Sequence, residues 1–318
     1  MRAPITLDLH ITNFNYPDVP PERLFDHVAE MAKTAEDNGF SSVSVMDHLH
    51  QIPPIGPQEM NMLEGNMALA GIAARTEKAS VGLLVGGVTY RNPALVAKMA
   101  TTLDVISGGR AIFGIGAAWF EAEHQAYGFR FPPLKERFEH LEDTLRIARA
   151  MFTQERATVE GTHHRVDGVL NNPRPLRGDI PILIGGSGER KTLRLVAQYG
   201  DGCNLFGDVE RVRHLLGVLD RHCEDVGRDP SEITRTRMAG VLIAETHEAA
   251  ERKKQAAAAA GVAQERLDTM LLGEPDAVAE AAAAYKDAGI QGMTVTLPDT
   301  WDLETIALTG RTLSAVFG

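Results

Sequence analysis

We predict that residues 1–318 form a single α/β domain, a (β/α)8 TIM barrel with a short insertion after the fourth βα unit. Segments that alternate apolar and polar residues are followed by amphipathic segments with helical spacing, and this pattern occurs eight times. Such alternation indicates a parallel sheet covered by helices. No linker divides the chain, and its length is ordinary for a closed barrel. An open, doubly wound sheet is the alternative.

The first half of the chain contains four strand and helix pairs. We expect strands in 5–14, 41–48, 79–90 and 110–119, and helices in 20–40, 62–78, 92–109 and 134–153. Several of these helices begin near a proline and end at an Asn-Gly or Gly-Gly pair, which are usual boundary residues. The segment 157–179 has β-branched residues and a proline-rich end, so we expect it to form a short hairpin or insertion.

The second half repeats the pattern and includes one long alanine-rich stretch. We expect strands in 180–188, 201–206, 233–246 and 290–298, and helices in 189–200, 209–227, 247–289 and 303–317. Alanine is the strongest helix former, so we interpret 247–289 as helical. Because proline interrupts a helix, we expect one break there, at Gly273-Glu274-Pro275.

Composition and charge exclude several classes of partner. The formal net charge is −11, which disfavours binding to the phosphate backbone of nucleic acids. No apolar run reaches the roughly 20 residues that span a membrane. Cys203 and Cys223 are the only cysteines, too few for a disulfide scaffold, which indicates a reducing compartment. We therefore expect a cytoplasmic protein that acts on a small molecule without nucleic-acid or membrane partners. We also expect a homodimer.

The fifth predicted strand ends in a glycine-rich turn, Gly185-Gly186-Ser187-Gly188. In a barrel, functional groups gather where strands end. This turn leads directly into a predicted helix, and the free N–H groups of a helix N-terminus bind anions. Arg190 and Lys191 lie just beyond. We interpret the segment as a phosphate site, and a simple strand-to-helix turn is the alternative.

The second predicted strand ends at Asp47-His48, followed by His50. A histidine next to an acid is a suitable proton donor or a polar cover for a planar ligand. The same three residues could hold a metal. However, the strands expected at 180–188 and 201–206 bring no histidine, so no metal site is expected there.

Histidines elsewhere are expected outside the site. His10 lies in the middle of a predicted strand, and we expect a structural role for it. His163 and His164 fall in the predicted hairpin, away from the strand ends, and we expect them on the surface. His48 is therefore the candidate for proton chemistry.

The fourth predicted strand runs into an unusual segment, "GIGAAWFEAEHQAYGF". Its glycines and alanines would allow the backbone to approach a phosphate-bearing tail. Trp119, Phe120 and Tyr127 could wall a flat ligand if they are exposed at the strand exit, and ordinary core packing is the alternative. Glu123 could begin a helix or, equally, support the site as a second proton-transfer group.

Three stretches resemble the luciferase-like monooxygenase superfamily, in particular its actinobacterial branch that uses the deazaflavin coenzyme F420. They begin with "MDHLHQIPPIGPQEMN", "GLLVGGVTYRNPALVAKMATTLDVISGGR" and "NNPRPLRGDIPILIGGSGERKTLRLVAQYGDGCNLF". The resemblance covers nearly the whole chain. The segment "WFEAEHQAYGF" is similar to the F420-using subgroup.

The resemblance implies an isoalloxazine-like ring at the C-terminal mouth of the barrel. It also implies a non-prolyl cis peptide at the third strand exit that supports the ring, and an acid–histidine pair at the second exit. Phosphate contacts are implied at two backbone segments. The matching catalytic residues are His48 and, as a further candidate, Glu123. The matching cofactor residues are Asp47, Leu84, Val85, Gly86, Ala117, Ala118, Trp119, Gly185, Gly186 and Ser187.

Two positions depart from the family pattern. Trp119 stands where the sugar-phosphate dehydrogenases of the family carry a catalytic glutamate, which argues against sugar-phosphate oxidation. Ala117 stands where luciferase-type members carry an arginine for the phosphate of FMN, which argues against FMN.

We therefore expect an F420-dependent oxidoreductase that transfers hydride between the C5 atom of the deazaflavin and a small organic substrate. His48 is expected to donate the proton, with Asp47 near the ring. One alternative is a flavin monooxygenase of the bacterial luciferase type that uses reduced FMN. Another is a non-catalytic protein that binds flavin or deazaflavin. A metal hydrolase barrel is disfavoured by the missing histidines.

Overall fold

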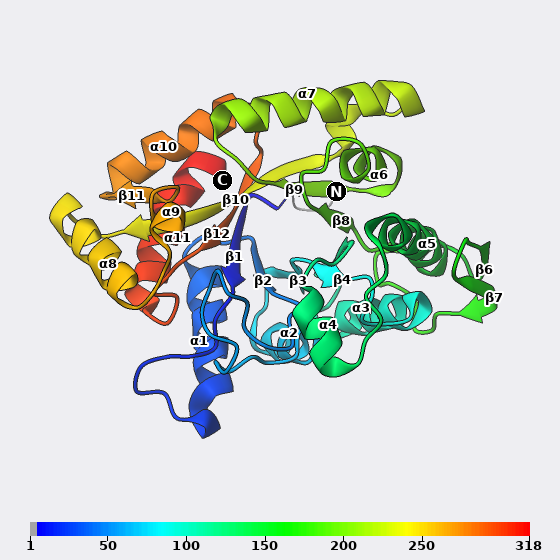
Figure 1. The fold of residues 1–318 in the computed structure, drawn as a ribbon, viewed down its shortest axis with the longest axis horizontal. Helices are drawn as coiled ribbons and strands as arrows, with labels where there is room; N and C mark the ends of the chain where they lie inside the picture. The colour runs from blue at the N-terminus through cyan, green and yellow to red at the C-terminus, as the bar shows by residue number, and fades with distance from the viewer. Residues whose placement is uncertain (1–4) are drawn as a thin grey trace.

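The computed structural model describes residues 5–318, and eight parallel strands form a closed barrel within it (Figure 1). β10 pairs with β9 on one side and β12 on the other, and β12 pairs with β1, so the ring of strands closes. The (β/α)8 barrel is thus confirmed, and the open sheet is excluded. In spatial order the strands are β1 Leu7–Ile11, β2 Ser42–Val45, β3 Ser80–Leu83, β5 Ala111–Gly116, β8 Ile182–Gly185, β9 Gly202–Leu205, β10 Thr234–Ile243 and β12 Gly292–Thr296.

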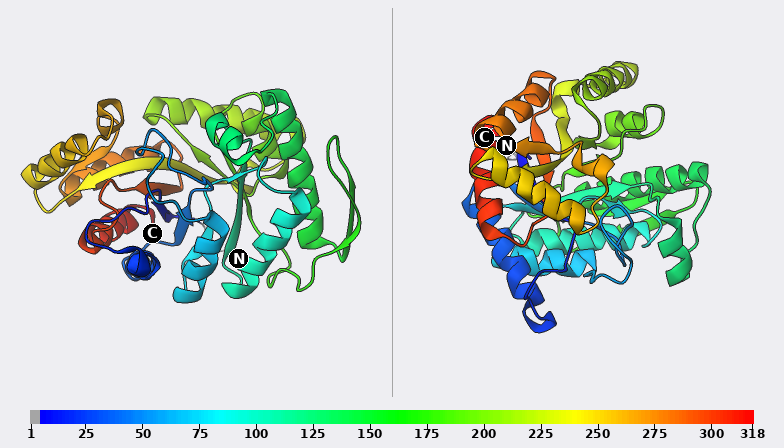
Figure 2. Two further views of the ribbon diagram at one scale, coloured as in Figure 1. Left: turned by 60° about the horizontal axis from the view of Figure 1, so that its bottom comes forward. Right: turned by 60° about the vertical axis from the view of Figure 1, so that its left-hand side comes forward.

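Helices surround the barrel (Figures 1 and 2). Their ends follow local signals. Asn92 precedes a helix and accepts hydrogen bonds from the N–H groups of Ala94 and Leu95, and Gly227 ends another helix with a φ of 69°. The helices are α1 Leu24–Asp37, α2 Gly65–Arg75, α3 Pro93–Ile106, α5 Leu134–Thr153, α6 Thr192–Tyr199, α7 Val209–Val226, α10 Pro275–Asp287 and α11 Leu303–Phe317, with short 3-10 turns at Pro21–Arg23 and Pro230–Glu232.

The third barrel strand is interrupted, whereas one continuous strand was predicted over 79–90. β3 ends at Leu83, and a separate short strand, β4 Gly86–Gly87, pairs with β5. The peptide bond between Leu84 and Val85 is cis, as the resemblance implied. We refer to these two residues as the β3 bulge. It lies at the carboxyl end of β3, where a barrel carries its functional groups.

The predicted insertion is a two-stranded antiparallel hairpin. It consists of β6 Arg156–Glu160 and β7 Arg165–Leu170 and follows α5 directly. The hairpin packs against α5 and lies at the edge of the molecule in Figure 1, outside the ring of barrel strands. It therefore extends the barrel at the position predicted for the insertion.

The alanine-rich segment 247–289 has one more break than predicted. α8 His247–Ala259 ends before Gly261, which has a φ of 94°, and is followed by the short helix α9 Gln264–Leu267. A further strand, β11 Leu271–Gly273, then pairs with β10. This pairing is a tertiary interaction that alanine content does not reveal. It carries α9 to the mouth of the barrel.

Polar side chains occupy the interior of the barrel next to this mouth. Successive residues of a strand point to opposite faces. On β1, Leu9 and Ile11 belong to the large apolar core, whereas the Asp8 carboxylate accepts hydrogen bonds from Ser42 at 2.9 Å and Ser44 at 2.6 Å. The strands thus enclose polar groups rather than only packed aliphatic ones, and this places hydrogen-bonding atoms below the site described next.

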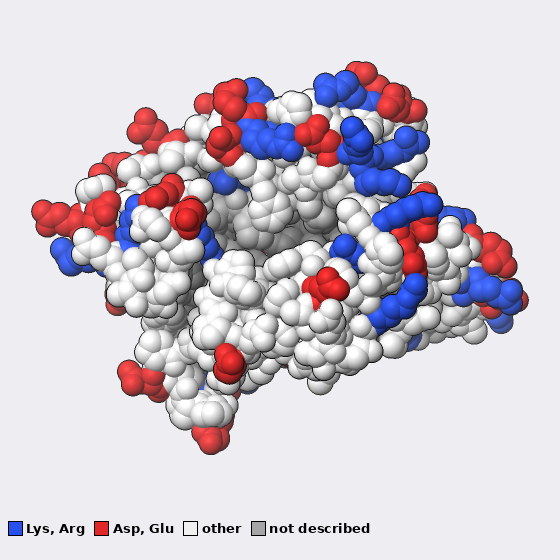
Figure 3. Space-filling model, in the orientation of Figure 1, with Lys and Arg blue, Asp and Glu red and all other residues white. Residues whose placement is uncertain are grey.

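Charged side chains are spread over the outer surface. Figure 3 shows them around the rim of a central hollow whose walls are largely uncharged. Cys203 and Cys223 are both buried and form no disulfide. Within residues 5–318, no helix has the combination of length and apolar character that crossing a bilayer requires.

Candidate active site

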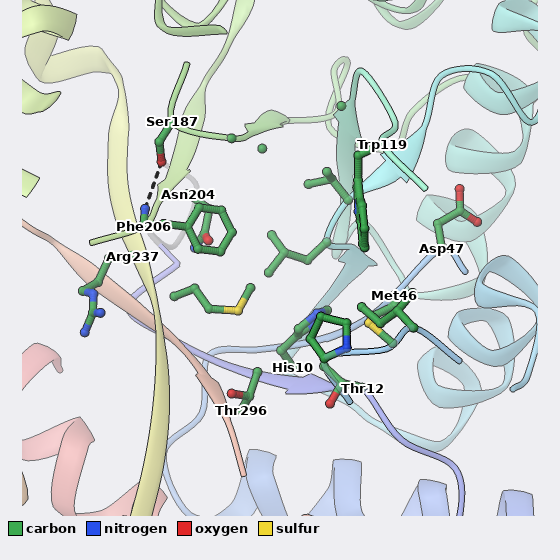
Figure 4. Close-up of a pocket in the computed structure, with 18 of the residues that line it drawn as sticks. His10, Thr12, Met46, Asp47, Trp119, Ser187, Asn204, Phe206, Arg237 and Thr296 are labelled. Atoms are coloured by element: carbon green, nitrogen blue, oxygen red, sulfur yellow. Dashed lines mark hydrogen bonds between the residues drawn. The ribbon is translucent and has the colours of Figure 1, made fainter. Parts of the chain in front are cut away.

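A cavity of about 1130 Å³ opens at the carboxyl ends of the barrel strands (Figures 3 and 4). Residues from the ends of β1, β2, β5, β8, β9, β10 and β12 line it, together with the β3 bulge and α9. Ligand pockets in proteins commonly measure about 300–1000 Å³. The cavity therefore has room for a multi-ring ligand and a small second molecule.

The β3 bulge forms part of the cavity wall, and three glycines make room for it. A side chain at Gly114 would overlap the carbonyl oxygen of Leu83. A Cβ at Gly116 or Gly185 would lie 2.9 or 2.7 Å from the Val85 side chain. Gly114 and Gly116 of "GIGAAW" thus make room for the β3 bulge. Gly116 also lines the cavity, and the close approach of this segment to a ligand tail stays a prediction.

Asp47 holds the backbone just beyond the β3 bulge, at Gly87. Its carboxylate accepts a hydrogen bond from the Gly87 N–H at 2.9 Å and two from Arg91, at 2.7 and 2.9 Å. Arg91 also pairs with Glu64 at 2.6 Å. Burial raises the pKa of Asp47, and the bonds from Arg91 oppose that shift. Asp47 lies at the cavity, but its carboxylate is committed to holding the backbone.

His48 lines the cavity and is supported from behind by Glu123, on the short helix α4 Glu121–Tyr127. The two side chains meet at 3.1 Å through Nδ1 of the histidine. Glu123 also accepts hydrogen bonds from the Tyr90 hydroxyl and the Leu49 N–H. Burial alone would raise the pKa of Glu123, but these hydrogen bonds outweigh burial and lower it to about 2. An ionised Glu123 fixes the His48 proton on Nδ1, so Nε2 is free for another partner.

Of the three aromatic residues predicted to wall the site, Trp119 lines the cavity. Its side chain is 56% exposed and meets the His48 ring edge-on, with centroids 5.6 Å apart. Phe120 is buried and packs as core. The Tyr127 hydroxyl donates to the Leu49 carbonyl at 3.1 Å, outside the cavity. Trp119 is therefore the exposed aromatic surface beside His48.

The loop at Ala117 and Ala118 is held by a residue that the sequence analysis did not single out. The Arg137 guanidinium donates to both of their carbonyl oxygens and stacks over Phe131 at 4.3 Å. Ala118 has a φ of 57°, unusual for a residue with a side chain. Both alanines line the cavity. Arg137 thus shapes the loop from outside while leaving the cavity side without a cation.

The glycine-rich turn after β8 also lines the cavity, at Gly185, Gly186, Ser187 and Gly188. The Ser187 hydroxyl accepts a hydrogen bond from the Phe206 N–H at 3.0 Å (Figure 4). The prediction that this turn leads directly into a helix is wrong, because α6 begins only at Thr192. The positions of two nearby cations also differ from expectation, since Arg190 and Lys191 line a shallow neighbouring groove instead of the cavity.

The cavity floor contains His10, which the sequence analysis set aside as structural. Its Nδ1 lies 2.9 Å from the Ser44 hydroxyl, which itself donates to Asp8. His10 must therefore donate through Nδ1. Burial lowers the pKa of His10 to about 3, so the ring is neutral and Nε2 is an acceptor. Figure 4 shows His10 with Thr12 and Thr296 on the cavity floor. In the sequence, Asp8, His10 and Thr12 alternate with apolar residues. This alternation could have indicated that His10 faces the interior of the barrel.

Two arginines also line the cavity, and sequence reasoning missed both. The Arg266 guanidinium donates to the Pro54 carbonyl at 2.8 Å, and Arg237 donates to the Gly207 carbonyl at 3.2 Å. Within the described part of the chain, neither has a carboxylate partner, and the buried Nε and Nη1 of Arg237 have no acceptor. Burial lowers the pKa of both groups. Arg237 is buried and stacks over the Tyr285 ring at 3.9 Å, and Arg266 is half-buried. Cations without a carboxylate partner favour a ligand that carries an acidic group.

These features define the class: a TIM-barrel protein with a cavity at the C-terminal mouth, between a bulged third strand and a histidine supported by a buried carboxylate. The sequence model of one family, described as luciferase-like monooxygenase, matches residues 8–267. The chain belongs to that family.

One curated relative and two solved structures are similar to this chain. The F420-dependent glucose-6-phosphate dehydrogenase of Intrasporangium calvum is 34% identical over 233 residues, which cover 68% of this chain and 64% of that protein. The chain spans about three fifths of the length of the curated relatives it matches. The coenzyme F420-dependent tetrahydromethanopterin reductase of Methanopyrus kandleri superimposes with a TM-score of 0.79 at 19% identity, over 99% of this chain and all of that one. The monooxygenase RslO1 of Streptomyces bottropensis gives 0.79 at 21% identity, over 98% of both chains.

Proposed function

We propose that this protein is an oxidoreductase that uses coenzyme F420 to transfer hydride to or from a small organic substrate. The observation that carries the proposal is His48, held by an ionised Glu123 at a cavity that the β3 bulge also lines. The name of the relative from Intrasporangium calvum supports F420 as the coenzyme. We do not assign the sugar-phosphate substrate of that relative to this protein, because Trp119 stands where such dehydrogenases have a glutamate.

The residues present fit a deazaflavin with a phosphate-bearing side chain. Leu84 and Val85 offer an apolar support for a flat ring. Among the described residues, the backbone N–H groups of Ser187 and Gly188 have no hydrogen-bond acceptor, and both residues line the cavity. Free N–H groups of this kind bind phosphate. Ala117 brings no cation for the phosphate of FMN, and this favours F420.

The protein side of the reaction rests on two neighbouring residues. When bound, the deazaflavin supplies or accepts hydride at its C5 atom. His48 handles the proton at Nε2, because Nδ1–H is committed to Glu123: a doubly protonated ring gives the Nε2 proton to a substrate oxygen when the substrate is reduced, and a neutral ring takes a proton at Nε2 when the substrate is oxidised. Glu123 is fully buried and lies behind the histidine, so it acts by positioning the ring. Trp119 covers the same side of the cavity.

Comparing the dissociation constants of F420 and FMN for the purified protein tests the proposal. We expect F420 to bind more tightly, with the Arg190→Ala variant, which changes a residue outside the cavity, binding like the wild type. Equal affinities, or tighter binding of FMN, would contradict the choice of F420 and support a flavin monooxygenase. Tight F420 binding without oxidation of the reduced coenzyme by any carbonyl acceptor would support a non-catalytic binding protein.

A further inference from the structure

A group of histidines and glutamates lies between α5 and the loop that joins β6 to β7, near the edge of the molecule in Figure 1 and away from the cavity. His140 on α5 meets His164 of the loop, Nδ1 to Nε2, at 2.8 Å. The ring of His163 lies 4.3 Å from that of His140, centroid to centroid. Glu136 approaches the other nitrogen of His140 at 3.4 Å, and Glu139 contacts His163 at 2.8 Å. The histidines predicted to lie on the surface, His163 and His164, are thus part of a cluster.

The backbone presents these side chains in a fixed arrangement. The Asp143 carboxylate is 2% exposed and accepts hydrogen bonds from the N–H groups of Thr162, His163 and His164, at 2.9, 2.7 and 3.0 Å. A side chain at Gly161 would overlap this carboxylate, so glycine permits the contact. The loop is therefore held against α5 by a buried acid that does not itself belong to the cluster.

The ligand atoms have the chemistry of a zinc site. One atom each from Glu136, His140 and His163 lies within 4.8 Å of the other two. Two ligands of a tetrahedral Zn²⁺ ion, each about 2.1 Å from it, are about 3.4 Å apart, so small side-chain rotations would close the site. Glu136 also pairs with Arg130, whose side chain is 72% exposed and free to leave. Two imidazoles and a carboxylate with an open fourth position suit zinc better than Mg²⁺ or Ca²⁺.

We propose that Glu136, His140 and His163 bind a divalent transition-metal ion, with Zn²⁺ the ion that fits the ligand set. Such an ion joins the insertion hairpin to the first turns of α5. The same turns carry Arg137, which holds the loop at the cavity, and Phe138, which lines it. The metal would therefore clamp one wall of the barrel mouth from outside without touching a ligand in the cavity.

Titration of chelator-treated protein with ZnCl2 tests this site independently of any enzymatic activity. We expect saturable binding that His140→Ala and His163→Ala each weaken by at least about tenfold. We also expect Zn²⁺ to raise the melting temperature of the wild type and not that of the variants. His247→Ala is the matched control, because His247 is exposed near Glu251 and Glu274 but has no second histidine in the group, and it should bind zinc like the wild type.

Two results would overturn the proposed zinc site. Absence of saturable zinc binding to the wild type overturns it, and so does wild-type affinity in both histidine variants. Glu136→Gln, which keeps the shape of the side chain, provides a second variant should an alanine variant fold poorly. It should weaken zinc binding while the circular dichroism spectrum stays unchanged.

Discussion

Two histidines line the same cavity, and the groups behind them differ. On the wall near α4, Nδ1 of His48 faces the Glu123 carboxylate, whose pKa is lowered to about 2. On the floor, Nδ1 of His10 faces the Ser44 hydroxyl, and burial lowers the pKa of His10 itself to about 3. The wall histidine has a negative charge beside it, and the floor histidine stays neutral. The partner and the burial, rather than the residue type, decide which imidazole can take part in proton transfer.

The difference extends to the surrounding residues. Around His48, the acids are paired: Asp47 with Arg91, and Glu123 with hydrogen-bond donors. Around the floor and its neighbouring loops, Arg237 and Arg266 have no carboxylate partner within residues 5–318. The acids of the wall are therefore all paired, whereas the opposite side has unused donors and the His10 acceptor. We infer that the wall serves the chemistry and the floor selects the substrate.

Replacing each of these two histidines by glutamine should produce the largest difference in turnover between the wall and the floor. His48→Gln should lower turnover roughly 10²–10⁴-fold, because glutamine cannot pass a proton. His10→Gln should lower turnover far less and act mainly on KM. Single-turnover oxidation of bound reduced F420 by an accepted substrate measures the chemical step. A wild-type rate constant in His48→Gln would remove this residue from the mechanism, and equal losses in both variants would break the comparison.

The β3 bulge beside His48 can be displaced through its neighbouring strand. In Gly114→Ala, the new methyl group overlaps the Leu83 carbonyl, so we expect a loss of roughly 1–3 kcal/mol in the free energy of unfolding and weaker F420 binding. Gly217→Ala is the control: this glycine lies within α7 with its nearest neighbouring atom 3.7 Å away, and alanine should stabilise the helix by roughly 0.5–1 kcal/mol. Unchanged F420 affinity in a folded Gly114→Ala protein would contradict the role of the bulge.

The neutral state of His10 should appear in the dependence of stability on pH. Its pKa is about 3 in the native protein and 6.5 in the unfolded chain, so the unfolded chain binds more protons between these values. Stability is therefore lost as the pH falls from 6.5 towards 3, by up to about 1.4 kcal/mol per pH unit from this residue. Urea denaturation between pH 4.5 and 6.5 should give a smaller slope for His10→Gln than for the wild type. Identical slopes would mean that His10 is not held neutral.

The smallest effect is expected at Arg190, which the sequence placed next to the phosphate site. Because Arg190 lies in the neighbouring groove, Arg190→Ala should leave the dissociation constant of F420 nearly unchanged. Fluorescence titration measures it at physiological salt, where long-range attraction between exposed charges is screened. A clear loss of affinity would show that the anionic end of the cofactor extends from the cavity into this groove.

The secondary structure could be predicted in most places because its signals are local. Alternating polarity, helical spacing and boundary residues such as Pro93 and Gly227 lie within each element. The interruption after Leu83 could not be predicted from these signals, because it depends on Gly114 of the neighbouring strand. The end of α8 and the strand β11 were missed for a similar reason, since β11 forms by pairing with β10.

The sequence by itself determined the barrel, the strand ends at which its functional groups gather, and the presence of Asp47 and His48 at one of them. It did not determine what stands behind each histidine. Glu123 is 75 residues from His48, and Ser44 is 34 residues from His10. Protonation depends on burial and on contacts at about 3 Å, and these arise only when distant strands and helices pack together. The residue types at the site therefore come from the sequence, whereas the neighbouring group that sets the protonation of each histidine comes from the tertiary structure.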